Sequence, residues 1–127
     1  MSPAERDAFL ATPRTAVLAT VDAAGRPHAV AVWFRAVDGE LRIVTARDSA
    51  KARNIARTGR AALCIDDRGG RPVSLTGEGP VTVAPLDPEE RFALWAHYRG
   101  EEAARATVAR GGHESMVLLT LRPERWY

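Results

Sequence analysis

The sequence predicts an α+β protein, mainly β, in which a small antiparallel barrel is flanked by short helices. Short apolar segments with strand-like patterns recur along the chain, and most are separated by turns rich in Gly, Asp or Pro. A few stretches with helix-capping signals interrupt these segments. The chain has 127 residues, the usual size of one domain with one hydrophobic core. We therefore expect residues 1–127 to form a single domain.

The first elements are a short helix and three strands joined by tight turns. Ser2 and Glu5 have the spacing of a capping box, with Pro3 at the first helical position, so a helix is expected over about residues 3–11. The Asp38-Gly39 pair is typical of a two-residue hairpin turn. The expected strands are 15–21, 28–36 and 40–46.

The second half alternates helices with strands. A helix capped by Ser49 or Asp48 and closed by Gly59 is expected over about 49–58. Further helices are expected from Asp87 to Gly100 and over about 101–110, and further strands at 60–66, 72–84 and 115–121.

The strand at 72–84 contains residues that weaken a regular ladder. Gly77, Gly79 and Pro80 fall in its middle. Because Gly and Pro are disfavoured inside paired strands, we expect this strand to be bent in the middle and not to form one regular ladder.

The composition excludes several classes of protein. With 46% hydrophobic and 27% charged residues the chain is typical of soluble globular proteins, and a net charge of +2 is too small for a dedicated nucleic-acid binder. No apolar run approaches the roughly 20 residues of a membrane span, and the N-terminus does not resemble a signal peptide. The single cysteine, Cys64, excludes an internal disulfide, so we expect a cytoplasmic protein.

The strand 28–36 is apolar on both of its alternating faces. Its segment AVAVWF places Ala29, Ala31 and Trp33 on one face and Val30, Val32 and Phe34 on the other. A barrel strand with water outside should have one polar face. The outer face is therefore expected to be covered by a second subunit, a ligand or both; the alternative is a helix of the same chain.

Lys51 is the only lysine among 18 basic residues and lies in the first turn of the helix after Ser49. The helix dipole already makes this end positive, so a cation there is unfavourable by roughly 0.3–1 kcal/mol unless an anion binds. Free backbone N–H groups, a serine hydroxyl and an ammonium group together predict a phosphate site. The alternative is a solvated basic stripe that needs no ligand, which we favour for Arg57 and Arg60.

Several segments in this order resemble one known family. They are AVLATV, GRPHAVAVWF, a strand ending in VTA, SAKARNI, ALCIDD and VSLTGEG. The sequence resembles the split-barrel flavin and deazaflavin oxidoreductases, which are relatives of pyridoxamine 5′-phosphate oxidase. The similarity covers about residues 14–84 and, more loosely, the last strand and RPERWY. The S-x-K-x-R-N helix start and the small size resemble the branch that uses the deazaflavin coenzyme F-420.

The resemblance implies a split antiparallel β-barrel of the FMN-binding type, forming a homodimer with cofactor at the subunit interface. It implies ring contacts from His28, Ala29, Val30, Ala31 and Val32, largely through the backbone, and ribityl contacts from Val44, Thr45 and Ala46. It implies phosphate contacts from Ser49, Ala50 and Lys51, with Arg53 and Asn54 nearby. Pro72, Val73 and Ser74 would approach the ring or tail, across the dimer in one arrangement.

The chain also departs from the family at two places. Many relatives have an arginine where Ser49 stands, and Arg47 or Arg53 would have to replace it in gripping the phosphate. The chain stops at Trp126-Tyr127 without the arginine- and histidine-bearing tail of pyridoxamine 5′-phosphate oxidase. We therefore do not expect that enzyme's own reaction.

The expected function is hydride transfer from reduced F-420 to a small organic acceptor such as an enone or quinone. The alternatives are an FMN-dependent oxidase or reductase and a non-enzymatic flavin- or haem-binding protein. His28, His97, Tyr98 and His113 are candidate proton donors, but for His97 and Tyr98 we favour a role in packing or capping their helix. The histidines and Cys64 lack metal-ligand spacing. Neither a membrane nor a nucleic acid is an expected partner.

Overall fold

The computed structural model describes residues 1–69 and 73–127, and it has the expected mixed architecture of an antiparallel sheet and short helices. The helices are α1 (Pro3–Leu10), α2 (Ala50–Thr58), α3 (Pro88–Arg99) and α4 (Glu101–Ala109), with a short 3-10 helix, η1 (His113–Ser115). The strands are β1 (Ala16–Val21), β2 (Pro27–Val32), β3 (Arg35–Val37), β4 (Glu40–Ala46), β5 (Arg60–Asp67), β6 (Val73–Pro85), β7 (Met116–Leu121) and β8 (Arg125–Trp126). In the described part of the chain, no helix is long and apolar enough to span a bilayer.

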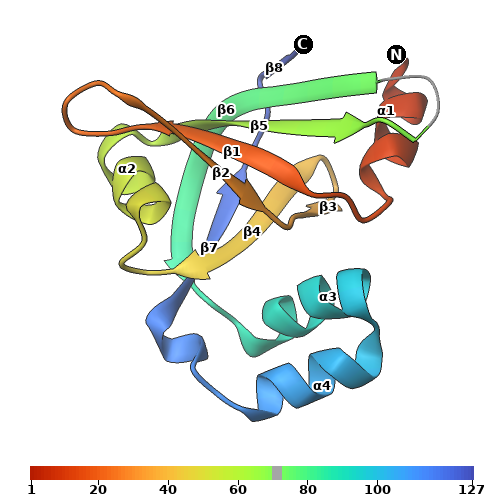
Figure 1. Cartoon of the computed structure of the whole chain (residues 1–127), viewed down its shortest axis with the longest axis vertical. Coiled ribbons are helices and arrows are strands. Elements are labelled where there is room, and N and C mark those ends of the chain that lie inside the picture. The colour runs from red at the N-terminus through yellow and green to blue at the C-terminus, as the bar shows by residue number, and fades with distance from the viewer. Residues whose placement is uncertain (70–72) are drawn as a thin grey trace.

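The strands form one strongly curved antiparallel sheet that closes only partly. Their order is β2-β1-β5-β6-β7-β4-β3, with β8 paired to β6. The long strand β6 belongs to both halves, because it pairs with β5 up to Pro80 and with β7 from Val81. The first and last strands of the path, β2 and β3, do not pair with each other, so the barrel is split between them (Figure 1).

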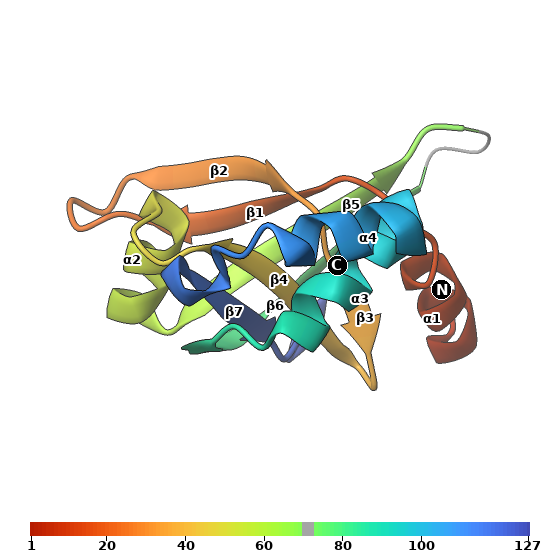
Figure 2. The same ribbon diagram turned by 90° about the horizontal axis from the view of Figure 1, so that it is seen from below.

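The core fills the inside of this barrel. Inward-facing side chains from both halves are fully buried, among them Leu18, Leu63 and Leu119. Helix α2 contributes Ile55 and closes one side of the barrel. The α3–α4 hairpin packs mainly on itself and lies below the barrel in Figure 1; Figure 2 turns it toward the viewer.

Most expected elements are confirmed, and the capping signals explain their ends. Ser2 and Glu5 form the capping box of α1, and Ser49 caps α2. Asp38 and Gly39 form the hairpin turn with positive φ angles of 50° and 81°. Gly59 closes α2 at a φ of 71°. The two-residue strand β8 was not expected from the sequence.

The expected single strand over 28–36 is wrong, because the chain breaks between β2 and β3 at Trp33 and Phe34. Phe34 turns into the core and is 1% exposed. Its backbone N–H donates to the Tyr98 hydroxyl over 3.0 Å, and that hydroxyl lies 2.6 Å from the Arg14 carbonyl oxygen. A side chain of α3 thus replaces a strand partner where the barrel is split.

The expected bend of the strand at 72–84 is confirmed, since β6 curves sharply in Figure 1 and no single ladder spans it: it pairs with β5 up to Pro80 and with β7 from Val81. Two of its glycines also allow the C-terminal segment to approach closely. A Cβ at Gly77 would lie 2.9 Å from the Trp126 ring, and one at Gly79 would collide with the Arg122 carbonyl oxygen.

Candidate functional site

The end of β4 and the start of α2 are fixed to each other by hydroxyl groups. The Thr45 hydroxyl donates to the Ser49 Oγ over 3.2 Å, and that oxygen accepts the N–H of Ala52 over 3.3 Å. The Ser49 carbonyl accepts the N–H of Arg53. Within the described residues, the backbone N–H groups of Ala50 and Lys51 have no acceptor, so the amino end of α2 remains an anion-binding feature.

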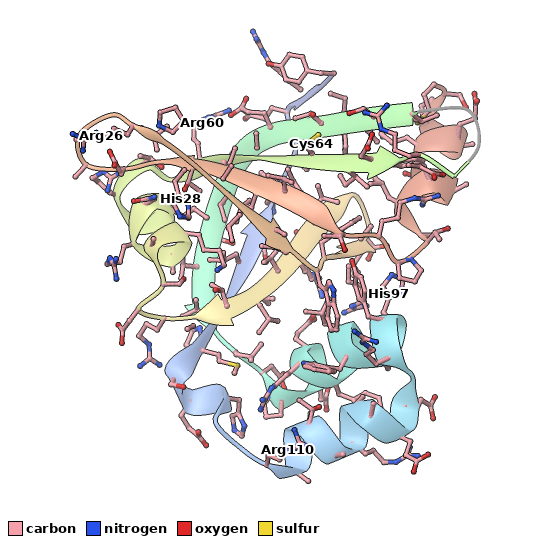
Figure 3. The ribbon with its side chains drawn as sticks, in the orientation of Figure 1. Arg26, His28, Arg60, Cys64, His97 and Arg110 are labelled. Carbon is pink, nitrogen blue, oxygen red and sulfur yellow. The ribbon has the colours of Figure 1, made fainter. Side chains whose placement is uncertain are left out.

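Five cations surround this helix without a carboxylate partner within ion-pair distance among the described residues, and we call them the α2 cation cluster. The cluster consists of Arg26, Arg47, Lys51, Arg53 and Arg57. Three of its arginines donate to backbone carbonyl oxygens: Arg47 to that of Glu114, Arg53 to that of Asp48 and Arg57 to that of Val21. Figure 3 shows Arg26 at the β1–β2 turn.

Two acidic residues lie near the cluster in sequence. The Oδ1 atom of Asp22 accepts the backbone N–H groups of Ala24 and Arg26, at 2.9 and 2.8 Å. Asp48 is exposed and lies just before the helix cap. Neither carboxylate is within ion-pair distance of a cluster cation in the described structure, so the positive field at α2 is left without a counter-ion.

Two strand edges next to the cluster have free backbone groups. β2 pairs only with β1 in the described sheet, and the part of β4 beyond Arg42 pairs only with β7. The open edges therefore belong to Pro27–Val32 and to the segment 43–46. Such edges offer N–H donors and C=O acceptors to a heterocycle with polar edges.

His28 has an unused polar atom between these features. Its side chain lies on the same face as Thr20, its direct partner on β1, and the Thr20 hydroxyl accepts the Asn54 amide over 3.0 Å. The Nδ1 atom of His28 is buried and has no hydrogen-bond partner in the described structure. A buried polar atom without a partner is unfavourable, and a ligand with a complementary group would satisfy it.

The outer face of the β2–β1–β5 sheet is apolar and uncovered in the single chain. Val17 and Val21 are 42% and 44% exposed. The other residues of this face are small or apolar: Ala19 on β1, Ala29 and Ala31 on β2, and Ala62 and Cys64 on β5. The alternative that a helix of the same chain covers this face is therefore wrong for Ala29 and Ala31, although α3 does cover Trp33.

A cavity of about 290 Å³ lies between α3 and the ends of β4 and β7. Its walls are Trp33, Val44, Thr45, Ala46, Arg91, Leu94, Trp95 and Met116. Sequence reasoning missed this cavity and Arg91, because an arginine inside an amphipathic helix has no signal that separates it from a solvated one.

The candidate proton donors differ in their environments. Burial, helped by the Arg35 charge, lowers the pKa of His97. Burial raises the pKa of Tyr98, and its hydroxyl is engaged by the backbone of Phe34 and Arg14. Tyr98 stacks on Trp33 at 4.5 Å, so its role is to fasten α3 to the barrel, as its packing interpretation predicted.

The structure brings most predicted site residues to one region but not all. Val44, Thr45 and Ala46 lead into Ser49, Ala50 and Lys51, while Asn54 reaches Thr20 opposite His28. Val30 and Val32 face the core, and Ala31 faces outward. Ser74 pairs with Asp66, at the end of the β5–β6 ladder far from α2. Pro72 lies outside the described residues.

Comparisons with known proteins agree with this geometry. A family model described as pyridoxamine 5′-phosphate oxidase matches residues 2–127. Among solved structures, a conserved hypothetical protein of Mycobacterium tuberculosis matches with a TM-score of 0.84 and 27% identity, over 99% of this chain and 82% of that chain. An F420 reductase matches with a TM-score of 0.81 and 25% identity, over 95% of this chain and 94% of that chain.

A heme storage protein of Vibrio cholerae has a TM-score of 0.75 and 20% identity, over 98% of this chain and 92% of that chain, which shows a shared fold alone. No curated protein matches the sequence.

Proposed function

The chain belongs to the pyridoxamine 5′-phosphate oxidase family, and on that premise we propose that it is an oxidoreductase that uses the deazaflavin coenzyme F-420 to reduce a small organic acceptor, such as an enone or a quinone. The observation that carries the proposal is the α2 cation cluster, five cations without a carboxylate partner in the described structure. The likeness to an F420 reductase, at 25% identity over 95% of this chain, supports it.

The residues at the amino end of α2 fit a phosphate group. The N–H groups of Ala50 and Lys51 lack acceptors in the described structure, and the ammonium group of Lys51 has no ion-pair partner there. Ser49 stands where many relatives have an arginine, and Arg47 and Arg53 flank it in sequence. Phosphate bound here would neutralise the charge that otherwise opposes the helix dipole.

The number of cations favours F-420 over FMN. One phosphate of FMN carries at most two negative charges, whereas F-420 carries a phosphodiester and a tail of glutamate carboxylates. Arg26 and Arg57 lie on the β1–β2 turn and the last turn of α2, away from the helix start. Cations spread over this distance suit an anion with several separated charges.

The ring would lie against the free edges of β2 and of the end of β4. Backbone N–H and C=O groups there, together with the unpartnered Nδ1 of His28, can hydrogen-bond its polar edge. When bound, reduced F-420 supplies a hydride; the protein's share is to orient the two reactants and exclude water.

We also propose that the protein works as a homodimer through the apolar face around Val17, Val21 and Ala31. Exposed apolar side chains over a sheet face mark interaction surfaces. In this arrangement Ser74, which is on that face, would approach the partner's cofactor. Sedimentation velocity tests this: the wild type should be dimeric and Val17→Glu monomeric, and a monomeric wild type would overturn it.

Titration of F-420 and of FMN into purified protein tests the cofactor proposal. We expect F-420 to bind with micromolar or tighter affinity and FMN at least tenfold more weakly. The phosphodiester and the tail carboxylates of F-420 would both be attracted to the cluster, and salt screens such attraction. The F-420 affinity should therefore fall with added salt more steeply than the FMN affinity. A yellow preparation with bound FMN, or equal affinity for the two, would contradict the proposal.

A non-enzymatic carrier is the second candidate, and the buried unpartnered Nδ1 of His28 is the observation that favours it, since an imidazole can also ligate haem iron. Hemin titration separates the two functions. A sharp Soret band that is lost in His28→Ala, with no F-420 binding, would establish the carrier. F-420 binding followed by reduction of a quinone or enone would establish the reductase.

A further inference from the structure

We propose that the cavity beside α3 binds the acceptor, and that this acceptor is a flat, conjugated carboxylic acid whose carboxylate pairs with Arg91. The acceptor role rests on the proposed function, because the cavity shares the wall Val44–Ala46 with the predicted cofactor site. The choice of a carboxylate rests on Arg91 itself, and the choice of a flat molecule rests on the aromatic walls.

Arg91 is a buried charge without a counter-ion in the described structure. It is 7% exposed, and no carboxylate of the described residues lies within ion-pair distance of it. Its Nη1 donates to the Gly111 carbonyl oxygen over 2.7 Å, at the carboxyl end of α4. A guanidinium has five N–H donors, so this bond leaves most of them unused.

Arg91 is one of the residues that line the cavity, so a ligand in the cavity is the group that could meet its remaining donors. Within the described residues, Nη1 is the one side-chain donor of Arg91 that has an acceptor. A planar guanidinium matches a carboxylate through two parallel hydrogen bonds. Burial of such a charge is strongly unfavourable without an anion, so the carboxylate of a ligand would supply the missing counter-ion of Arg91.

The remaining walls select a flat and small ligand. Trp33 and Trp95 meet edge to face at 5.1 Å, and Leu94 and Met116 complete an apolar lining. Aromatic walls of this kind stack on planar conjugated systems. A volume of about 290 Å³ is at the small end for ligand pockets, which suits a molecule of one or two rings.

In the proposed reaction, an α,β-unsaturated acid paired with Arg91 would accept a hydride at its β-carbon, which is the chemistry that reduced F-420 would supply when bound. The carbon–carbon π bond breaks, and the α-carbon takes a proton from water. The acid gains two electrons and two hydrogens, and the coenzyme is oxidised by two electrons. The Arg91–carboxylate pair would act as a positioning contact for the acceptor.

Cinnamate binding to the cofactor-free protein tests the cavity independently of F-420. Trp33 and Trp95 line the cavity, so their fluorescence should be quenched as cinnamate binds. We expect cinnamamide, which has the same shape but no charge, to bind at least tenfold more weakly. Equal affinities for acid and amide, or no binding of either, would overturn the proposal.

Two variants assign the effect to Arg91. Arg91→Gln retains a donor for the Gly111 carbonyl and should reduce the preference for cinnamate to less than threefold, whereas Arg91→Lys should retain it in part. Arg105→Gln, an exposed arginine of α4, is the matched control and should behave as wild type. An unchanged preference in folded Arg91→Gln would overturn the proposal.

The outcomes for cavity and cofactor are separable. Selective cinnamate binding without F-420 binding would contradict the proposed reductase while leaving a carboxylate site. F-420 binding without selective cinnamate binding would contradict only the carboxylate site.

Discussion

Two groups of basic residues in this protein differ in whether they have carboxylate partners. Around α3 and the β3–β4 hairpin, Arg35 and Arg42 share the Glu90 carboxylate, and Glu40 pairs with Arg42 and Arg122. Around α2, the five cluster cations have no such partner in the described structure. Unpaired cations close together repel each other. We therefore infer that the paired arginines stabilise the fold, whereas the α2 cation cluster is available for an anionic ligand.

The largest effect on stability is expected from Glu90→Gln in the paired region. Arg35 and Arg42 are only 26% and 25% exposed, and their buried Nε atoms already lack partners. Removing their shared carboxylate should lower the free energy of unfolding by about 2 kcal/mol, measured by urea denaturation. The control is Glu101, which forms an exposed ion pair with Arg105. Glu101→Gln should change the free energy of unfolding by less than about 0.5 kcal/mol. F-420 affinity should stay unchanged in both variants.

The next effect concerns binding rather than stability. Lys51→Met keeps the aliphatic stem but removes the charge, and we expect F-420 to bind at least tenfold more weakly, a loss of about 1.4 kcal/mol. Because a cation at a helix start is unfavourable, the free energy of unfolding should stay level or rise slightly. Calorimetry of Arg110→Met, an exposed cation at the lower end of the molecule in Figure 3, should show wild-type affinity. Wild-type F-420 affinity in Lys51→Met would contradict the role of the α2 cation cluster in binding the cofactor.

The smallest effect is expected from acid. A hydrogen bond from Arg60 lowers the pKa of Glu78, and the Gly69 N–H followed by Arg14 lowers the pKa of Asp67. A carboxyl group whose pKa is lowered in the folded state stabilises the fold at pH values above its ordinary pKa, which is 4.5 for Glu78. This stabilisation is lost as the pH falls through the lowered pKa of the folded state.

Thermal unfolding should therefore show wild type and Glu78→Gln converging as the pH drops below about 4.5. Lys51→Met should follow the wild-type pH profile, because no carboxylate pairs with the lysine in the described structure. A difference between wild type and Glu78→Gln that persists at pH 2.5 would contradict the assignment.

Local signals predicted most of the fold. Ser2, Ser49, Asp38-Gly39 and Gly59 act through their own backbone neighbours, and the ends that they define are confirmed. Two features that were not predicted come from contacts between distant segments. Tyr98 hydrogen-bonds to Phe34 between β2 and β3. The C-terminal segment at Trp126 packs so close to β6 that a side chain at Gly77 would collide with it.

The residues of the candidate site differ in how far the sequence alone points to them. Lys51 stood out because its charge opposes the local dipole, which is a property of the sequence itself. The unpaired state of Arg26 and Arg47 depends on which carboxylates come near in space. The cavity depends on how α3 docks onto Trp33, and no periodicity in α3 encodes that position.

The strand β6 has a consequence for how the molecule unfolds. Its pairing with β5 and with β7 is continuous, so one segment carries the register of both halves of the barrel. A slip of one residue would turn inward side chains outward in both halves at once. Neither half can then melt by itself, and loss of structure in the barrel should be a single all-or-none event.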